Sequence, residues 1–256
     1  MERQVQFSNT FGETIKGTLH DPEMSSDRGI VLGHCFTCFR HTGILREIAK
    51  QLSFKGFMAL RFDFSGNGQS GGAFENSTYS KQISEMTAGT ELLVEAGIQW
   101  MGLAGHSLGA SVAVLTAAQE GRVRAVCAIA GRLSGMSPKH FLNSHQKDEL
   151  SRTGRVQFNS RGRSLELTST FFSDARGYDL HEIVAGQGAP MLVVHGEMDD
   201  IVPVSEARRA KETNPDRVEL AVFNNADHMF SAADIRESVA QRITEWFSAQ
   251  YEMTSR

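Results

Sequence analysis

The chain contains the stretch WMGLAGHSLG at residues 100–109, in which a short apolar run leads into a serine flanked by glycines. A run of small residues with helical spacing follows at Ala110–Gln119. Strand, sharp turn and helix in this order form the context in which a Gly-x-Ser-x-Gly pattern holds a nucleophilic serine above a sheet. Gly105 and Gly109 leave room for the strand and the helix to approach each other. We therefore predict that Ser107 presents its hydroxyl at a helix N-terminus, which favours negative charge; the alternative is a helix-capping serine in a plain turn.

Outside this stretch, apolar runs alternate with helical patterns along the chain. Runs rich in β-branched and other apolar residues predict further strands at Val5–Phe7, Thr14–His20, Gly29–His34, Phe57–Asp63, Val123–Ala130, Met191–His195 and Val218–Phe223. Apolar residues at three- and four-residue spacing predict helices at Ile44–Leu52, Thr78–Ala96, Ser205–Glu212 and Ala233–Gln250. This alternation predicts the α/β class, with a mostly parallel, doubly wound sheet and helices on both faces.

Residues from about 132 to 188 interrupt this alternation. Within them, polar and apolar residues alternate at Val156–Phe158 and Leu165–Leu167, on either side of Ser160–Arg163, which predicts a β-hairpin. We expect a short cap-like insertion packed above the sheet, after the strand that follows the serine-bearing helix. The sequence has no internal repeat and no proline- or glycine-rich linker. A single domain spanning residues 1–256 is therefore expected.

Composition limits the classes of function that are open to the chain. The 256 residues include 26 lysines and arginines against 30 aspartates and glutamates, a formal net charge of −4, and no long basic run. A nucleic-acid partner is therefore not expected. No apolar stretch is long enough to cross a bilayer, and the first residues lack the apolar core of a secretory signal, so we expect neither a membrane partner nor export. Three cysteines, an odd number, argue against a disulfide framework and favour a cytoplasmic location.

Two loops that follow predicted late strands offer the partners that an activated serine needs. His195–Pro203 contains Asp199, and Asn224–Phe230 contains His228. Because the carboxyl ends of parallel strands share one edge of a sheet, both side chains could converge there on Ser107. A histidine can take the serine proton, and a carboxylate can hold the histidine in the required tautomer. The three residue types therefore predict nucleophilic catalysis at this edge.

Five motifs run nearly from end to end of the chain: His34-Cys35-Phe36-Thr37, the stretch from Arg61 to Ser70, the glycine-flanked serine, the loop with Asp199, and the pair Asp227-His228. With these motifs the chain resembles the α/β-hydrolase superfamily, and within it the serine aminopeptidase-like and small bacterial carboxylesterase branch. The resemblance implies the α/β-hydrolase fold and a catalytic triad. It implies Ser107 as nucleophile, His228 as general base and then general acid, and Asp199 as the orienting carboxylate.

Several neighbouring residues compete for these roles. Asp200 and Glu197 are alternatives to Asp199, although the spacing to Val202-Pro203 in the resembled pattern favours Asp199. Three further histidines in the motifs are interpreted as structural residues that fix loops: His34, His106 and His195. The resemblance also implies a structural role for Asp63, which would organise the turn containing Gly66 and Gly68.

An oxyanion hole requires two N–H donors aimed at the tetrahedral oxygen. One donor is expected from the backbone of Leu108, and the resemblance points to the backbone of Phe36 for the other. Cys35 stands where the resembled pattern has glycine, which leaves the local backbone conformation open. Cys35 and Cys38 also form a C-x-x-C beside His34 and His41, so zinc binding or redox chemistry is an alternative. Since no second ligand pair exists, a metal is not expected, and the acyl-enzyme route requires no organic cofactor.

The function expected from these residues is hydrolysis of a small-molecule carboxylic ester, with a small acyl group, through an acyl-enzyme. Phe74-Glu75-Asn76 resembles a stretch of cinnamoyl and feruloyl esterases, which makes aryl esters an alternative. A small-peptide serine aminopeptidase is a second alternative, and a non-catalytic binding module is a third. The oligomeric state is not fixed by the sequence. Residues of the insertion available to line the substrate pocket are Phe141, Phe158, Phe171, Phe172 and Met136.

Overall fold

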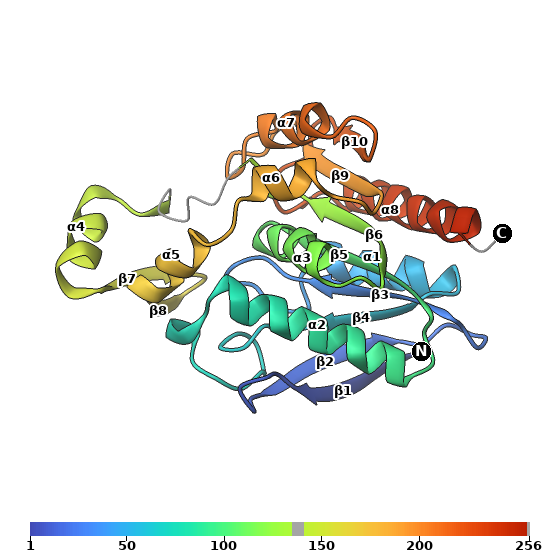
Figure 1. The fold of residues 1–256 in the computed structure, drawn as a ribbon, viewed down its shortest axis with the longest axis horizontal. Helices are drawn as coiled ribbons and strands as arrows, with labels where there is room; N and C mark the ends of the chain where they lie inside the picture. Colours follow the sequence, from blue (N-terminus) through green and yellow to red (C-terminus); the bar gives the residue numbers. More distant parts are fainter. Residues whose placement is uncertain (135–140, 255–256) are drawn as a thin grey trace.

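The computed structural model describes residues 1–134 and 141–254 (Figure 1). Met136, one of the expected pocket residues, lies outside these ranges. An eight-stranded sheet has the order β1-β2-β4-β3-β5-β6-β9-β10, in which β1 and β2 are antiparallel to their neighbours and the other strands are parallel. The strands are β1 Glu2–Ser8, β2 Thr14–His20, β3 Arg28–Gly33, β4 Met58–Phe62, β5 Trp100–His106, β6 Val123–Ile129, β9 Met191–Gly196 and β10 Val218–Phe223.

Helices cover both faces of this sheet (Figure 1). One face packs against α1 Gly43–Phe54 and α8 Ala233–Thr254. The other packs against α2 Tyr79–Glu95, α3 Leu108–Gln119, α6 Leu180–Ala185 and α7 Ser205–Thr213. The central strands are buried on both sides for this reason, and β5 has no exposed residue. The predicted α/β class, with a mostly parallel sheet between two helical layers, is confirmed.

The insertion forms a separate small layer and one helix of the main layer. The predicted hairpin is present as β7 Arg155–Ser160 paired with β8 Arg163–Thr168. With α4 Ser144–Thr153 and α5 Ser169–Ala175, it extends beyond the end of the sheet, at the left of Figure 1. The expectation that the whole insertion lies above the sheet is wrong for α6. This helix packs against α3 and α7, because Leu180 and Val184 bury their side chains in the core beneath it.

The order of the strands places the functional loops together. β3, β5, β6, β9 and β10 run parallel, so the loops that follow them open at one edge of the sheet. Glu197 N donates to Phe223 O at 3.0 Å and Met198 N donates to Ala226 O at 3.0 Å, which joins the loops after β9 and β10. A side chain at Gly196 would collide with the Ala226 carbonyl, so the close approach of these loops requires glycine. In the parts of the chain described here, no helix is long and apolar enough to span a membrane.

Candidate active site

The turn between β5 and α3 holds Ser107 in a strained conformation. Its backbone has φ 57° and ψ −116°, a region that a residue with a Cβ seldom adopts. The turn is over-determined from both sides: Ser107 N donates to Ile129 O at 2.8 Å, and Ser107 O accepts from Ala110 N at 3.0 Å. Because a Cβ at Gly105 would collide with the Gly109 carbonyl, the strand and the helix can meet this closely only with glycines. The geometry is that of a nucleophile elbow.

The two expected oxyanion donors come from segments that are packed together. A Cβ at Gly109 would collide with the carbonyl of Gly33, so the first turn of α3 lies directly against the end of β3. Leu108 is the first residue of α3, and its amide therefore has no acceptor within the helix. The Phe36 amide donates to no residue of the described ranges. Cys35 does not have a positive φ, so a side chain at this position carries no backbone penalty.

Asp199 and His228 are joined by a hydrogen bond of 2.8 Å from His228 Nδ1 to Asp199 Oδ2. The Asp199 side chain is fully buried, and its Oδ1 accepts from the amides of Ile201 and Val202 at 2.9 and 2.8 Å. Burial alone would raise the pKa of this carboxyl. Hydrogen bonds from His195, His228 and the Val202 amide outweigh burial and hold the pKa well below its ordinary value, so Asp199 is ionised.

The two competing carboxylates are placed differently. Glu197 points to solvent and pairs with Arg208 at 2.9 Å. Asp200 is exposed and makes no hydrogen bond to His228 within the described residues. The geometry therefore selects Asp199 as the partner of His228.

Ser107 and His228 line the same pocket, but their side chains are not hydrogen bonded. Ser107 is half-buried, and its hydroxyl has no hydrogen-bond partner among residues 1–134 and 141–254. His228 is 7% exposed. Its Nδ1 is held by Asp199, so Nε2 is the nitrogen left to act as a base. Without substrate, such serine–histidine contacts are commonly long and shorten in the complex.

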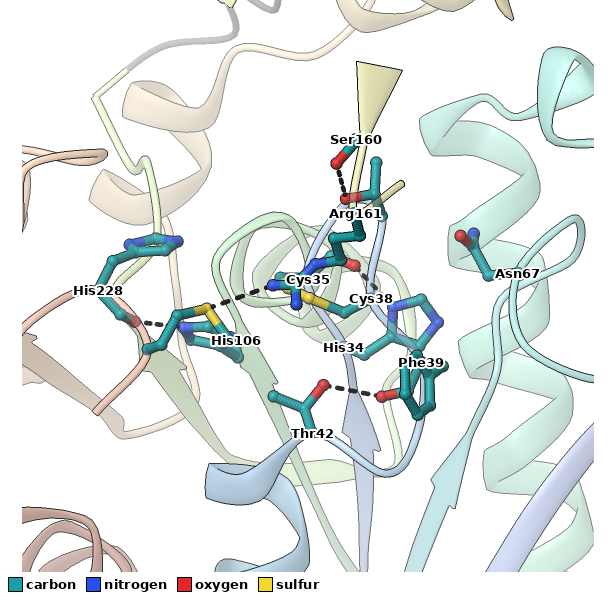
Figure 2. The surroundings of a disulfide bond; sticks show 12 residues. His34, Cys35, Cys38, Phe39, Thr42, Asn67, His106, Ser160, Arg161 and His228 are labelled. Carbon is teal, nitrogen blue, oxygen red and sulfur yellow. Dashed lines mark hydrogen bonds between the residues drawn. A yellow bond between two sulfur atoms is a disulfide. The ribbon is translucent and has the colours of Figure 1, made fainter. Parts of the chain in front are cut away.

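Three buried histidines support the site, and Figure 2 shows two of them beside His228 and the β3–α1 loop. His106 Nε2 lies 2.8 Å from the His228 carbonyl, to which it donates, and burial lowers the pKa of His106 to about 3. His34 Nδ1 lies 2.7 Å from Cys35 O and its Nε2 accepts from Phe64 N at 2.9 Å. Burial lowers the pKa of His34 to about 4, which keeps both rings neutral. His195 Nε2 lies 2.8 Å from Val202 O, which fixes the loop of Asp199.

Asp63 lies beneath the glycine-rich turn after β4, away from the pocket. It accepts hydrogen bonds from Arg40 N at 2.6 Å and Gln69 N at 2.9 Å, and it pairs with the Arg40 guanidinium. A Cβ at Gly68 would collide with its carboxylate, and Gly68 has φ 53°. These contacts fit the structural role that the resemblance implies for Asp63.

Cys35 and Cys38 form a disulfide in the loop after β3 (Figure 2). The cysteine count argued against a disulfide framework and did not predict this single bond. The reason is local: Cys38 N donates to Cys35 O at 3.1 Å, and this turn brings the two Cα atoms to 5.2 Å. The third cysteine, Cys127, is free and buried in β6. Within the described ranges, no group of three histidine, cysteine or acidic side chains could hold a metal ion.

An open pocket of about 510 Å³ contains three of the candidate residues, Phe36, Ser107 and His228. It is lined by Cys35, Phe36, Thr37, Ser107, Ser160, Arg161, Asp200, Ile201, Asp227, His228 and Met229. Ser160 and Arg161, at the tip of the β7–β8 hairpin, were not predicted as pocket residues. The sequence feature that could have identified these two residues is the predicted hairpin, because its tip reaches over the site.

The expected phenylalanines of the insertion pack on one another rather than line this pocket. Phe36 stacks on Phe158 with ring centroids 5.8 Å apart and lies 5.4 Å from Phe141. Phe171 and Phe172 are 1% and 2% exposed and belong to the core. An aromatic cluster therefore occupies the space behind Phe36.

The fold and the strained serine define the class of protein: this is a serine hydrolase with the α/β-hydrolase fold, as the sequence motifs suggested. A sequence model of the prolyl oligopeptidase family matches residues 45–254, which is most of the chain. The chain therefore belongs to the prolyl oligopeptidase family. The match begins after the loop that contains Phe36. The narrower resemblance, to the serine aminopeptidase-like and carboxylesterase branch, stays a prediction.

Solved structures with the same fold cover nearly the whole chain. Est1E from Butyrivibrio proteoclasticus with bound ferulic acid is 20% identical, with a TM-score of 0.81 over 97% of this chain and 99% of that one. The esterase domain of a Rhodothermus marinus protein is 23% identical, with a TM-score of 0.74 over 96% and 97%. Mouse alpha/beta hydrolase domain-containing protein 10 is 19% identical, with a TM-score of 0.78 over 96% and 99%. A search of curated proteins found no significant match.

Proposed function

We propose that this protein hydrolyses carboxylic esters through an acyl-enzyme, with Ser107, His228 and Asp199 as its catalytic triad. One observation carries the proposal. A serine held in a strained turn shares a pocket with a histidine whose Nδ1 is fixed by a buried, ionised carboxylate. This arrangement leaves His228 Nε2 free to accept a proton from a hydroxyl in the pocket.

In the first half-reaction, Ser107 Oγ attacks the ester carbonyl carbon while His228 Nε2 takes its proton. The carbonyl oxygen becomes an oxyanion, for which the amides of Leu108 and Phe36 are the proposed donors. Asp199 stabilises the imidazolium because its low pKa keeps it charged throughout the cycle. The tetrahedral species then expels the alkoxide, which takes the proton from His228 and leaves as the alcohol.

In the second half-reaction, water replaces the alcohol in the open pocket. His228 Nε2 takes a proton from the water, whose oxygen attacks the acyl carbon bound to Ser107. Collapse of the second tetrahedral species breaks the bond to Ser107 Oγ, and His228 returns the proton to this oxygen. The products are a carboxylic acid and the free enzyme, so the proposed reaction consumes only ester and water.

Esters with a small acyl group fit this site better than large ones. The aromatic cluster that includes Phe36 and Phe158 already fills the space behind the proposed oxyanion donor. The likeness to the Rhodothermus marinus esterase domain supports ester chemistry at the level of the shared fold. We therefore propose short-chain esters as the substrates.

Aryl esters are a second candidate, favoured by one observation. The similar Est1E structure contains ferulic acid. In this chain, however, Phe74 of the resembled Phe74-Glu75-Asn76 stretch is 7% exposed and packs 5.3 Å from Phe36. This stretch therefore contributes to the aromatic cluster rather than to an open aryl pocket.

The proposal is tested with p-nitrophenyl esters of increasing acyl length, methyl ferulate and alanine p-nitroanilide, each with wild type and Ser107→Ala. The expected result is Ser107-dependent turnover that peaks at acetyl or butyryl esters. Turnover restricted to methyl ferulate would replace short-chain esters by aryl esters. Ser107-dependent turnover of the anilide alone would replace esterase by peptidase activity, to which the family name points. No Ser107-dependent turnover of any of them would contradict the proposal and favour a binding role.

A further inference from the structure

Arg161 places a cation at the mouth of the candidate active site. It occupies the tip of the β7–β8 hairpin and lines the same pocket as Ser107 and His228. Figure 2 shows its side chain running from the hairpin toward the Cys35–Cys38 disulfide, with His228 on one side and His34 on the other.

The hairpin fixes the direction of this side chain. Arg161 and Gly162 have φ values of 52° and 73°, both in the left-handed region that a two-residue turn between twisted strands requires. Asparagine or glycine is the usual residue at the first of these positions, so an arginine there carries a backbone cost. The hairpin is also tied to the β3–α1 loop, because Ser160 Oγ and Thr37 Oγ lie 2.8 Å apart and Arg163 donates to Thr37 O at 2.9 Å. Arg161 is thus held over the site from both sides of the turn.

Within the described residues, Arg161 differs from Arg155 of the same hairpin by lacking a counterion, and from Arg163 by donating to no oxygen atom. Arg155 pairs with Glu166 at 2.6 Å, and Arg163 donates to Thr37 O and Asn67 Oδ1. The contact made by the Arg161 guanidinium is with Met229 Sδ, at 3.7 Å. In the described part of the chain, no carboxylate lies within 4.0 Å of it.

Two carboxylates line the same pocket and limit the charge of any ligand. Asp227 Oδ1 accepts from Ser231 N at 2.8 Å, and Asp200, which also lines the pocket, is exposed. With one unpaired guanidinium and two carboxylates, the pocket suits a group with a single negative charge better than a doubly charged phosphate. A carboxylate also matches the two-donor fork of arginine.

The position of Met229 indicates which part of the substrate carries this charge. Met229 directly follows His228, the residue that protonates the departing alcohol in the proposed reaction. The contact of the guanidinium with Met229 favours the part of the substrate that His228 protonates, which is the departing alcohol. We propose that Arg161 is a specificity-determining residue that binds a carboxylate on the alcohol portion of the ester; this inference rests on the proposed esterase function.

The test compares 4-acetoxybenzoate with 4-acetoxybenzamide, two acetyl esters of nearly the same shape that differ in the charge of the leaving group. Both give the same acetyl-enzyme, so any difference in kcat/KM arises before deacylation. We expect wild type to prefer the benzoate by about 10-fold or more. Arg161→Gln should lower kcat/KM for the benzoate by about 10- to 100-fold, mainly through KM, and for the benzamide by less than about 3-fold.

Three further variants and one further ester make the result specific. Arg161→Lys should retain an intermediate preference, because it keeps the charge but loses the fork. Arg155→Gln, on the same hairpin, should leave both substrates unchanged. Equal losses on both substrates in Arg161→Gln, or no loss on either, would overturn the inference while leaving the esterase intact. A preference for 4-acetoxyphenyl phosphate over the benzoate would also overturn it. If Ser107→Ala turns over the esters as well as wild type, the proposed function itself has failed.

Discussion

The floor and the roof of the pocket are built in opposite ways. The floor, formed by the ends of β5 and β9 and by the loops after β3, β5, β9 and β10, contains His34, His106 and His195 at 0% exposure, each with a hydrogen-bonded ring. The roof is the β7–β8 hairpin, whose tip residue Arg161 is exposed. A change in the floor disturbs several buried polar groups at once, whereas a change in the roof alters one contact at a time. We infer that the floor carries the chemistry and that the roof selects the substrate.

The floor also explains how a strained serine is tolerated. Ser107 is held by hydrogen bonds to Ile129 O and from Ala110 N, and glycines on both sides allow the close contacts around it. The roof has no comparable support. Its links to the floor include the contact between Ser160 and Thr37, the hydrogen bond from Arg163, the stacking of Phe158 on Phe36 and the contact of Arg161 with Met229. None of these four contacts involves a side chain of the proposed triad. The roof can therefore change in sequence without disturbing the proposed triad.

The largest effect is expected from a substitution in the floor that changes one side-chain atom. Asp199→Asn removes the charge that holds the His228 tautomer, so kcat on p-nitrophenyl acetate should fall by about 10⁴-fold. The measurement is steady-state kinetics, with melting temperature as a check that the fold is retained. Asp200→Asn is the matched control and should change kcat by less than about 3-fold. Equal losses in both variants would remove Asp199 from its proposed role.

A pH titration of stability tests how deeply the floor is buried. The folded-state pKa values of His34 and His106 are about 4 and 3, below that of an unfolded histidine, so the unfolded chain binds protons first on acidification. Stability is therefore lost as the pH falls below about 6.5, by roughly 2 kcal/mol for each histidine between pH 7 and pH 5. Urea unfolding at several pH values measures this slope. His106→Gln should flatten it, whereas His145→Gln, at an exposed position, should not; a slope unaffected by His106→Gln would contradict this account of the floor.

The disulfide lies where floor and roof meet, and reducing it should have a smaller effect. Cys35 and Cys38 enclose Phe36, whose amide is a proposed oxyanion donor. Reduction by a phosphine should free this segment and lower kcat on p-nitrophenyl acetate by up to about 10-fold, with little change in KM. The double variant Cys35→Ser, Cys38→Ser should have the lower kcat from the start and should not respond to the phosphine. A wild-type rate unchanged after complete reduction would show that the other contacts of the loop suffice.

The smallest effect is expected where the roof touches the floor. Removing one hydroxyl of the Ser160–Thr37 pair, in Ser160→Ala or Thr37→Val, should cost about 1 kcal/mol of unfolding free energy, and the double variant little more. Neither variant should change kcat on p-nitrophenyl acetate by more than about 3-fold. A loss of kcat comparable to that of Asp199→Asn would contradict the claim that the floor, and not the roof, carries the chemistry.

Local sequence patterns were enough to predict the strands and loops that form the floor, and the structure shows why. The glycines around Ser107, the apolar strands and the loops of Asp199 and His228 are short-range features that a parallel sheet brings to one edge. The β-hairpin was predicted from its alternation for the same reason. The fold class therefore follows from these patterns, whereas the roles of the site residues were implied by the resemblance and stay a prediction.

Features that depend on contacts between residues distant in sequence could not be predicted from local sequence patterns. An arginine at a hairpin tip is ordinarily solvated, and the position of Arg161 depends on Ser160 meeting Thr37, 123 residues away. The bond from His106 to the His228 carbonyl spans 122 residues. The Cys35–Cys38 bond was missed for another reason, because counting cysteines ignores a turn that brings two of them together. The packing of α6 on α3 was hidden by the short length of that helix.

Covalent labelling tests most directly whether Ser107 is the nucleophile that the floor activates. The protein is treated with a fluorophosphonate, and the adduct is located by peptide mass spectrometry in wild type, His228→Gln and Arg161→Gln. The account predicts one adduct, on Ser107, that forms at least about 10²-fold more slowly in His228→Gln and at the wild-type rate in Arg161→Gln. An adduct on another residue, or labelling of Ser107 that is equally fast without His228, would contradict it.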